Sequence, residues 1–130
     1  MSATLRQIVG RALPAQVAWA LLSALWNVAG VYLIAQGLRA PGPTASLTTA
    51  LLLIAIAVAL YAAVDRASLL YAALSGIATF MALAAVVNAF VQDPALWPSE
   101  FWRYAGAVLN GAGFVAGAAA VLAYFRWTSR

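Results

Sequence analysis

Four long apolar stretches, separated by short polar connectors, make up nearly the whole chain. The hydrocarbon core of a bilayer is about 30 Å thick, and an α-helix needs about 20 apolar residues to cross it. The pattern therefore predicts an all-α, polytopic membrane protein, a four-helix transmembrane bundle that forms a single domain over residues 1–130. The predicted spans cover about residues 15–38, 46–64, 69–90 and 101–124.

The connectors carry the residues that begin and end these helices. Pro14 suits a first helical turn, where its missing N–H would be unpaired anyway. The proline-rich 39–43 segment ends the first helix, and the 65–68 turn makes an antiparallel hairpin of the second and third. The second span lacks charged side chains, so it is the best candidate for a lipid-facing helix. A cleaved signal peptide is the alternative for the first span, but its apolar region is usually about 7–15 residues long.

In the 92–103 connector, Asp93-Pro94 can cap a short helical turn. Ser99 and Glu100 can cap the fourth helix, because a serine oxygen accepts from free backbone N–H groups and an acid is favoured by the helix dipole. Asp93, Glu100 and Arg103 can also meet at this interface, where we expect a solvated ion pair.

The arginines predict the orientation, because cytoplasmic flanks of spans collect positive residues. With four spans, one side of the membrane receives Arg6, Arg11, Arg66, Arg126 and Arg130. The other side receives Arg39 and Arg103, so we expect both termini in the cytoplasm and the 92–103 connector in the periplasm. Interfacial aromatics agree with these boundaries: Trp97, Phe101, Trp102 and Tyr104 on one side, and Tyr124, Phe125 and Trp127 on the other.

Composition excludes several classes of function. The chain is 66% hydrophobic and 8% charged, whereas roughly a quarter of residues are charged in soluble domains. It has no cysteine, histidine or lysine, and its acids, Asp65, Asp93 and Glu100, fall in connectors, so we expect no metal, no cofactor and no enzyme. Its scattered arginines form no basic patch for nucleic acid. The alanine-rich, lysine-free bias is typical of a high-GC bacterial genome and favours the bacterial inner membrane.

Polar side chains inside the spans should face other helices or water, because contact with hydrocarbon is costly. They are Ser23, Asn27, Ser75, Thr79, Asn88 and Asn110. Asn27, Asn88 and Asn110 can line a polar path on the periplasmic half. The competing interpretation is that asparagines fasten the bundle, at about 0.6 kcal/mol per hydrogen bond.

Small residues follow the same faces. Ala20, Ser23, Asn27, Gly30 and Ile34 form one stripe on the first helix, and Gly106, Asn110, Gly113, Gly117 and Ala120 form one on the fourth. Gly113 and Gly117 make a GxxxG motif, which permits close helix packing. We expect the first and fourth helices to pack tightly. The similarity of residues 27–30 to residues 110–113 is either a trace of an inverted repeat or a coincidence.

Trp19 and Trp26 lie seven residues apart on one face of the first helix. They can stack against a lipid, quinone or pigment, but packing against small residues of a neighbouring helix is favoured. A buried indole N–H needs an acceptor, which Ser23 or an asparagine can supply.

The function favoured by the sequence is that of a non-catalytic four-span protein, either self-associating or an accessory subunit of a larger membrane complex. One alternative is a homo-oligomeric channel or transporter for a small neutral or anionic solute, lined by Asn, Ser and Thr. The chain resembles small four-span multidrug transporters and fluoride channels only in length and span count, without their signature residues. The second alternative is a lipid- or isoprenoid-binding protein. Membrane lipids and another membrane subunit or copy are the expected partners.

Overall fold

The fold is all-α. A computed structural model of the chain describes residues 3–66 and 68–129, with side chains for all of these except residues 3–5 and 127. Within these described residues, four α-helices follow one another: α1 (Ala3–Ala35), α2 (Leu47–Ala63), α3 (Ser68–Val91) and α4 (Glu100–Thr128). A 3-10 turn, η1 (Pro94–Leu96), precedes α4. The helical prediction is thus confirmed for each stretch. Arg130 and the side chain of Trp127 lie outside the described residues.

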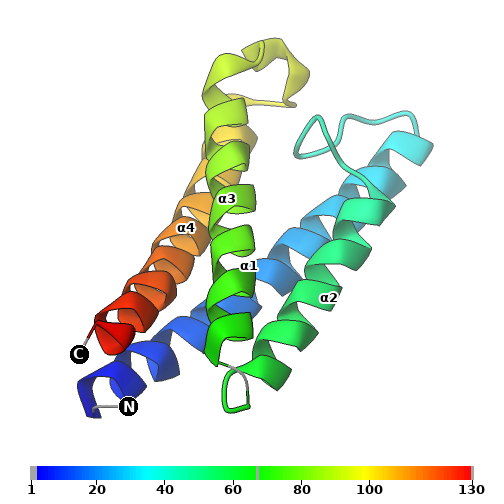
Figure 1. Cartoon of the computed structure of the whole chain (residues 1–130). Coiled ribbons are helices and arrows are strands. Elements are labelled where there is room, and N and C mark those ends of the chain that lie inside the picture. Colours follow the sequence, from blue (N-terminus) through cyan, green and yellow to red (C-terminus); the bar gives the residue numbers. More distant parts are fainter. Residues whose placement is uncertain (1–2, 67, 130) are drawn as a thin grey trace.

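Each helix runs antiparallel to the next, and α1 joins the two halves of the molecule (Figure 1). It packs against α2 on one side and α4 on the other, while α3 packs most extensively against α4. Both chain ends and the α2–α3 turn lie at one end, which we call the termini end. The 36–46 and 92–99 connectors lie at the opposite end, which we call the connector end (Figure 1).

Three helices are long and apolar enough to cross a membrane: the Arg6–Ala35 part of α1, all of α3, and the Glu100–Arg126 part of α4. The helix α2 is apolar but shorter, with 17 residues. At about 1.5 Å per residue it is only ~25 Å long. The second predicted span was two residues longer, because Ser46 caps the helix instead of joining it and Val64 ends it.

The first helix begins well before the predicted span. We placed Pro14 in the first turn, but it lies inside α1. A proline inside a helix removes one backbone hydrogen bond and costs about 3 kcal/mol. The preceding segment nevertheless stays helical because Ala12 is buried and Val9 and Leu13 pack against the core. Tertiary packing therefore outweighs the local preference of proline.

The end of α1 was also predicted too late. Gly37 has a φ of +75°, a left-handed conformation that favours glycine. Around it, the Gly37 N–H donates to Ile34 O and the Leu38 N–H donates to Leu33 O, each over 2.9 Å. These two bonds form a Schellman motif, which satisfies the last carbonyls of a helix. The glycine, and not the following prolines, ends the helix.

Alanines fill the interior, and large apolar side chains face outward. Ala20, Ala78, Ala82 and Ala120 are among the most deeply buried residues. Leu51, Val58, Phe80 and Val108, in contrast, are largely exposed. Ile34, which we placed on the interior stripe of α1, is also exposed, at 52%. The large apolar side chains therefore lie mainly on the outer surface, whereas small alanines make up much of the core.

A hydrogen-bonded cluster joins α1 to α3 in the half of the molecule toward the termini end. Gln16 Nε2 donates to Ser75 Oγ over 2.9 Å, and Tyr71 Oη donates to Gln16 Oε1 over 2.7 Å. Both Gln16 and Ser75 are 0% exposed. Ser75 was expected inside the bundle, whereas Gln16 was not singled out, because it falls at the start of the predicted span.

The glycines of α4 permit close approach of two different helices. A Cβ at Gly113 would overlap the indole of Trp19 from α1. A Cβ at Gly117 would overlap Thr79 from α3 and lie 3.2 Å from Ser75 O. Gly30 packs instead against Ala45 in the 36–46 connector, so the predicted α1–α4 stripe does not include it. The two helices do pack together, but α4 is shared between α1 and α3.

Candidate functional site

A partly open cavity of about 370 Å³ lies at the connector end. Residues of all four helices, including Thr49 and Leu53 of α2, and of both connectors surround it. Its polar lining includes Ser23, Asn27, Asn88, Arg103 and Asn110. The three asparagines that the sequence placed on one half of the membrane are thus brought to one cavity.

Two of these asparagines are held in the same way from opposite walls. Asn27 Nδ2 donates to Ser23 O over 2.8 Å, and Asn110 Nδ2 donates to Gly106 O over 2.9 Å, in each case four residues earlier in the helix. Asn27 Oδ1 accepts from the backbone N–H of Ser46 over 3.0 Å. A carboxamide has two N–H donors, so each side chain keeps one N–H beyond the hydrogen bonds of the described chain.

Asn110, which lines the cavity, also holds Trp19, which lies outside the lining. Its Oδ1 accepts from Trp19 Nε1 over 3.1 Å, which joins α4 to α1. An asparagine is therefore the acceptor that the buried indole required. Asn88 lies at the rim and is exposed, since it occupies the last turn of α3.

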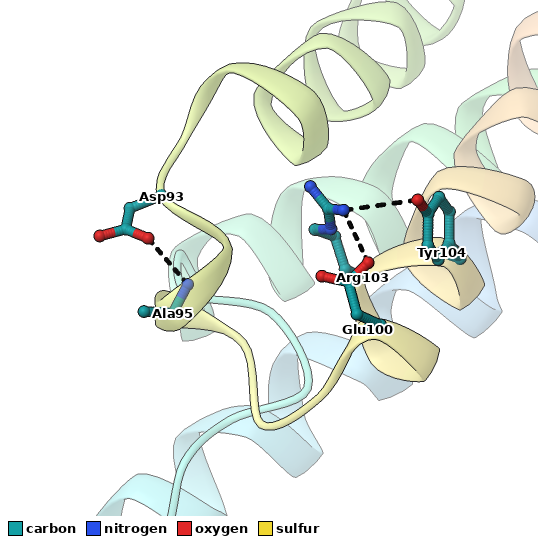
Figure 2. A network of polar contacts seen from close by, with 5 residues as sticks. All are labelled: Asp93, Ala95, Glu100, Arg103 and Tyr104. Atoms are coloured by element: carbon teal, nitrogen blue, oxygen red, sulfur yellow. Dashed lines mark hydrogen bonds and ion pairs between the residues drawn. The ribbon is translucent and has the colours of Figure 1, made fainter.

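Arg103 brings a positive charge to the cavity from the first turn of α4 (Figure 2). Its Nη2 forms an ion pair with Glu100 Oε2 over 2.7 Å and also donates to Tyr104 Oη over 3.4 Å. The guanidinium carbon lies 5.8 Å from the ring centre of Phe90. The Arg103 side chain is 12% exposed and that of Glu100 is 59% exposed. Glu100 is therefore solvated, whereas Arg103 is largely buried. We had expected both members of the ion pair to be solvated.

Two polar atoms of the cavity lining have no hydrogen-bond partner within the described chain. They are Ser23 Oγ and Arg103 Nε, and both are buried. Ser23 as a whole is 7% exposed. A buried polar atom without a partner costs about 1–3 kcal/mol, so both atoms favour a ligand or water that completes their hydrogen bonding.

Trp26 separates this cavity from an apolar groove of about 560 Å³ on the outside of the α1–α4 pair. Trp26 and Leu109 line both. The indole packs against Trp102 in an edge-to-face arrangement, with ring centres 5.6 Å apart. It also approaches two glycines, because a Cβ at Gly42 would lie 3.0 Å from Nε1 and one at Gly106 would lie 3.5 Å from Cζ2.

The two connectors meet beside the cavity. Arg39 Nη1 donates to Ala95 O over 3.0 Å, which joins the 36–46 segment to η1. Asp93 caps η1 as predicted, with Oδ1 accepting from Ala95 N over 2.9 Å (Figure 2). Asp93 therefore does not join the Glu100–Arg103 pair. The predicted Ser99 cap is wrong in part, because Ser99 occupies the cap position without a side-chain hydrogen bond.

The predicted site residues divide into two groups. Ser23, Trp26, Asn27, Asn88 and Asn110 line the cavity. Thr79 does not, because its hydroxyl donates to Ser75 O over 2.7 Å within α3 and lies against Gly117. Trp19 also lies outside the lining, packed on Gly113. Packing of Trp19 and Trp26 against glycines of α4 agrees with the interpretation that the sequence favoured.

Arg103 and Trp97 are among the lining residues that were missed as site candidates. Arg103 was regarded as a member of a solvated pair and Trp97 as part of an interfacial belt, although Trp97 is buried against the cavity. Their signal in the sequence is weak. Only the combination of Asn88, Gln92 and Arg103 around one connector indicates a polar group near the membrane boundary.

Comparisons with protein-family models, curated proteins and solved structures give no match to this chain.

Proposed function

We propose that this chain is a non-catalytic integral membrane protein that binds a lipid-like amphiphile at its connector end. The polar head of the ligand occupies the cavity, and its hydrocarbon chain lies in the adjoining groove. The observation that carries the proposal is the shared lining: Trp26 and Leu109 belong to both the polar cavity and the apolar groove.

The surface of the molecule supports a position in the membrane. Large apolar side chains such as Leu51, Val58 and Phe80 point outward along the helices. Monomeric soluble proteins rarely expose apolar patches of more than a few hundred Å². Hydrocarbon around the bundle would remove this cost, and three helices have the required length. We include α2 as the fourth span, since ~17 residues is the lower limit for a spanning helix.

The size of the cavity supports a head group and not a whole lipid. Ligand pockets typically measure about 300–1,000 Å³, and this one, at about 370 Å³, is near the lower limit. A hydrocarbon chain would have to lie elsewhere, and the groove beyond Trp26 is apolar except for Arg39 at its edge.

The lining supports binding without catalysis. General acid–base or nucleophilic chemistry needs an activated group with a partner in reach. Among the described residues around the cavity there is no Asp, Glu, His, Cys or Lys. Ser23 consequently has no base beside it that could activate its hydroxyl.

The other two functions expected from the sequence, self-association and a path for a solute, receive less support. The glycines that motivated self-association, Gly113 and Gly117, are occupied within the chain by Trp19 and Thr79. A solute path through one copy would have to cross the half of the molecule toward the termini end, where the Gln16–Tyr71–Ser75 cluster fills the interior. Both expectations would require surfaces shared with another subunit.

The orientation is also part of the proposal. Arg6, Arg11, Arg66 and Arg126 belong to the termini end, whereas Arg39 and Arg103 belong to the connector end. Because positive residues collect on the cytoplasmic side, the termini end faces the cytoplasm of a bacterial cell and the cavity faces the periplasmic leaflet of its inner membrane.

The test is native mass spectrometry of the full chain released from mild detergent, with a variant that fills the cavity. Ala85→Phe in α3 adds a ring to the lining, and Ala73→Phe adds the same ring to an exposed position of the same helix. We expect the wild type and Ala73→Phe to retain a lipid mass that Ala85→Phe loses. Equal retention by all three proteins would contradict the proposal.

A further inference from the structure

One side chain of the cavity lining, Arg103, indicates the charge of the ligand. We infer that the ligand is an anionic amphiphile, a lipid with a phosphate or similar anion in its head, and that Arg103 is the residue that recognises the anion. This inference rests on the proposed function, since it assigns the chemical class of ligand to the same cavity and groove.

Among the described residues that line the cavity, one is a cation and none is an anion. Arg103 is the charged residue among those that surround the cavity, and the carboxylate of Glu100 neutralises one edge of its guanidinium from outside the lining. The Nε donor remains buried without a partner within the described chain. Hydrogen bonds to charged groups are roughly twice as strong as neutral ones, so an anionic acceptor satisfies this donor best.

The other walls supply donors for the same anion. Asn27 and Asn110 each keep one amide N–H after the hydrogen bonds that hold them. Ser23, which is more than nine-tenths buried, has a hydroxyl without a partner and lines the same space. A tetrahedral anion offers several acceptor oxygens, and these groups approach from α1 and α4.

The position of Arg103 is held before any ligand arrives. The ion pair with Glu100, the contact with Tyr104 and the ring of Phe90 each restrain the guanidinium. A fixed donor loses less conformational entropy when a ligand binds. Glu100 thus acts as a positioning residue, and its exposed carboxylate lies outside the cavity lining.

The apolar groove commits the ligand to a lipid and not to a free anion. It shares Trp26 and Leu109 with the cavity and offers an apolar surface of the kind that a hydrocarbon chain covers. Inorganic phosphate would fill the cavity but leave that surface uncovered. The amphiphile would satisfy both parts of the site at once.

The test is a competition between two lipids for the purified full chain. The protein is equilibrated in mixed micelles that contain equal amounts of phosphatidylglycerol and phosphatidylcholine, and the bound lipid is read by native mass spectrometry. We expect the wild type to prefer phosphatidylglycerol by about tenfold, since a tenfold ratio corresponds to about 1.4 kcal/mol. We expect Arg103→Gln to lose the preference and Arg126→Gln, which removes the same charge at the termini end, to retain it.

Several outcomes would overturn the inference. Equal retention of the two lipids by the wild type does so without any variant. A preference for phosphatidylcholine would do so as well, and would indicate that Trp26 and Trp97 receive the ammonium group. Displacement of phosphatidylglycerol by millimolar inorganic phosphate would make the ligand a free anion. If the wild type retains neither lipid, the proposed function itself fails, whereas lipid lost by Ala85→Phe without head-group preference leaves that function in place.

Discussion

Asn27 and Asn110 face one cavity from α1 and α4 with matching hydrogen bonds. Each donates to a carbonyl four residues earlier in its helix, and each accepts an N–H from another element: Ser46 for Asn27 and Trp19 for Asn110. The sequence offered two interpretations of the asparagines, that they hold the helices together or that they line a polar space. In the structure both apply to the same two side chains. The hydrogen bonds that hold the helices together also fix the orientation of two side chains that line the cavity.

Replacement of Asn110 by leucine should destabilise the protein. Asn110→Leu removes the acceptor of Trp19 Nε1 and leaves a buried donor without a partner. We expect the free energy of unfolding to fall by about 1–2 kcal/mol, measured by SDS titration followed by tryptophan fluorescence. Asn88→Leu is the control, because Asn88 is exposed at the rim, and its effect should stay within about 0.5 kcal/mol. Equal effects would contradict a special role for the Trp19–Asn110 bond.

Gly113→Ala should destabilise the folded monomer. The added methyl would overlap the indole of Trp19, whereas a Cβ at Gly111, two residues earlier, meets nothing within 4 Å. We expect Gly113→Ala to lower the free energy of unfolding by about 1–3 kcal/mol. Gly111→Ala should be neutral or stabilising by up to about 1 kcal/mol, because alanine is the better helix former. A change in oligomer mass with unchanged unfolding would instead indicate a glycine surface between copies.

The buried cluster between α1 and α3 should behave as one unit. Gln16→Leu leaves Tyr71 Oη and Ser75 Oγ without their shared partner, and we expect it to cost about 1–3 kcal/mol. Tyr71→Phe removes one of those stranded groups. The double variant should therefore lose less stability than the sum of the single variants, by about 0.5 kcal/mol or more. Strict additivity in a double-mutant cycle would show that the two side chains are independent.

The absence of cysteine from the sequence permits a direct test of the proposed orientation. Ala95 in the connector and Ser129 after α4 are both exposed. In intact bacterial spheroplasts, a membrane-impermeant maleimide should label Ala95→Cys and leave Ser129→Cys unlabelled until the membrane is opened. Labelling of Ser129→Cys alone would indicate the reverse orientation, and labelling of both would place the connector end and residue 129 on the same, periplasmic side.

The four helices could be predicted from the sequence because their length and apolar character follow from the residues alone. The ends of α1 could not be predicted, because the effects of Pro14 and Gly37 on a helix depend on the surrounding structure. Pro14 stays within the helix because Ala12 and its neighbours pack against the core. Gly37 ends the helix by adopting a left-handed conformation. The other glycines among the described residues do not have a positive φ.

The candidate site was predictable in part for the same reason. Asparagines in an apolar helix must face inward, so Asn27 and Asn110 could be assigned to a common interior. The role of Arg103 could not be assigned, because its exposure depends on how the 92–99 connector folds over α4. Gln16 was overlooked because it falls where the predicted span starts, and only the extension of α1 to Ala3 places it deep inside the bundle.

The walls of the cavity come from both halves of the chain, and this has a consequence for biosynthesis. Its lining extends from Ser23 in α1 to Asn110 in α4. A nascent chain that has completed α1, α2 and α3 still lacks one wall and Arg103. The cavity is therefore among the last features to form during synthesis. If the proposed ligand binds there, a truncated product without α4 would not compete with the finished protein for it.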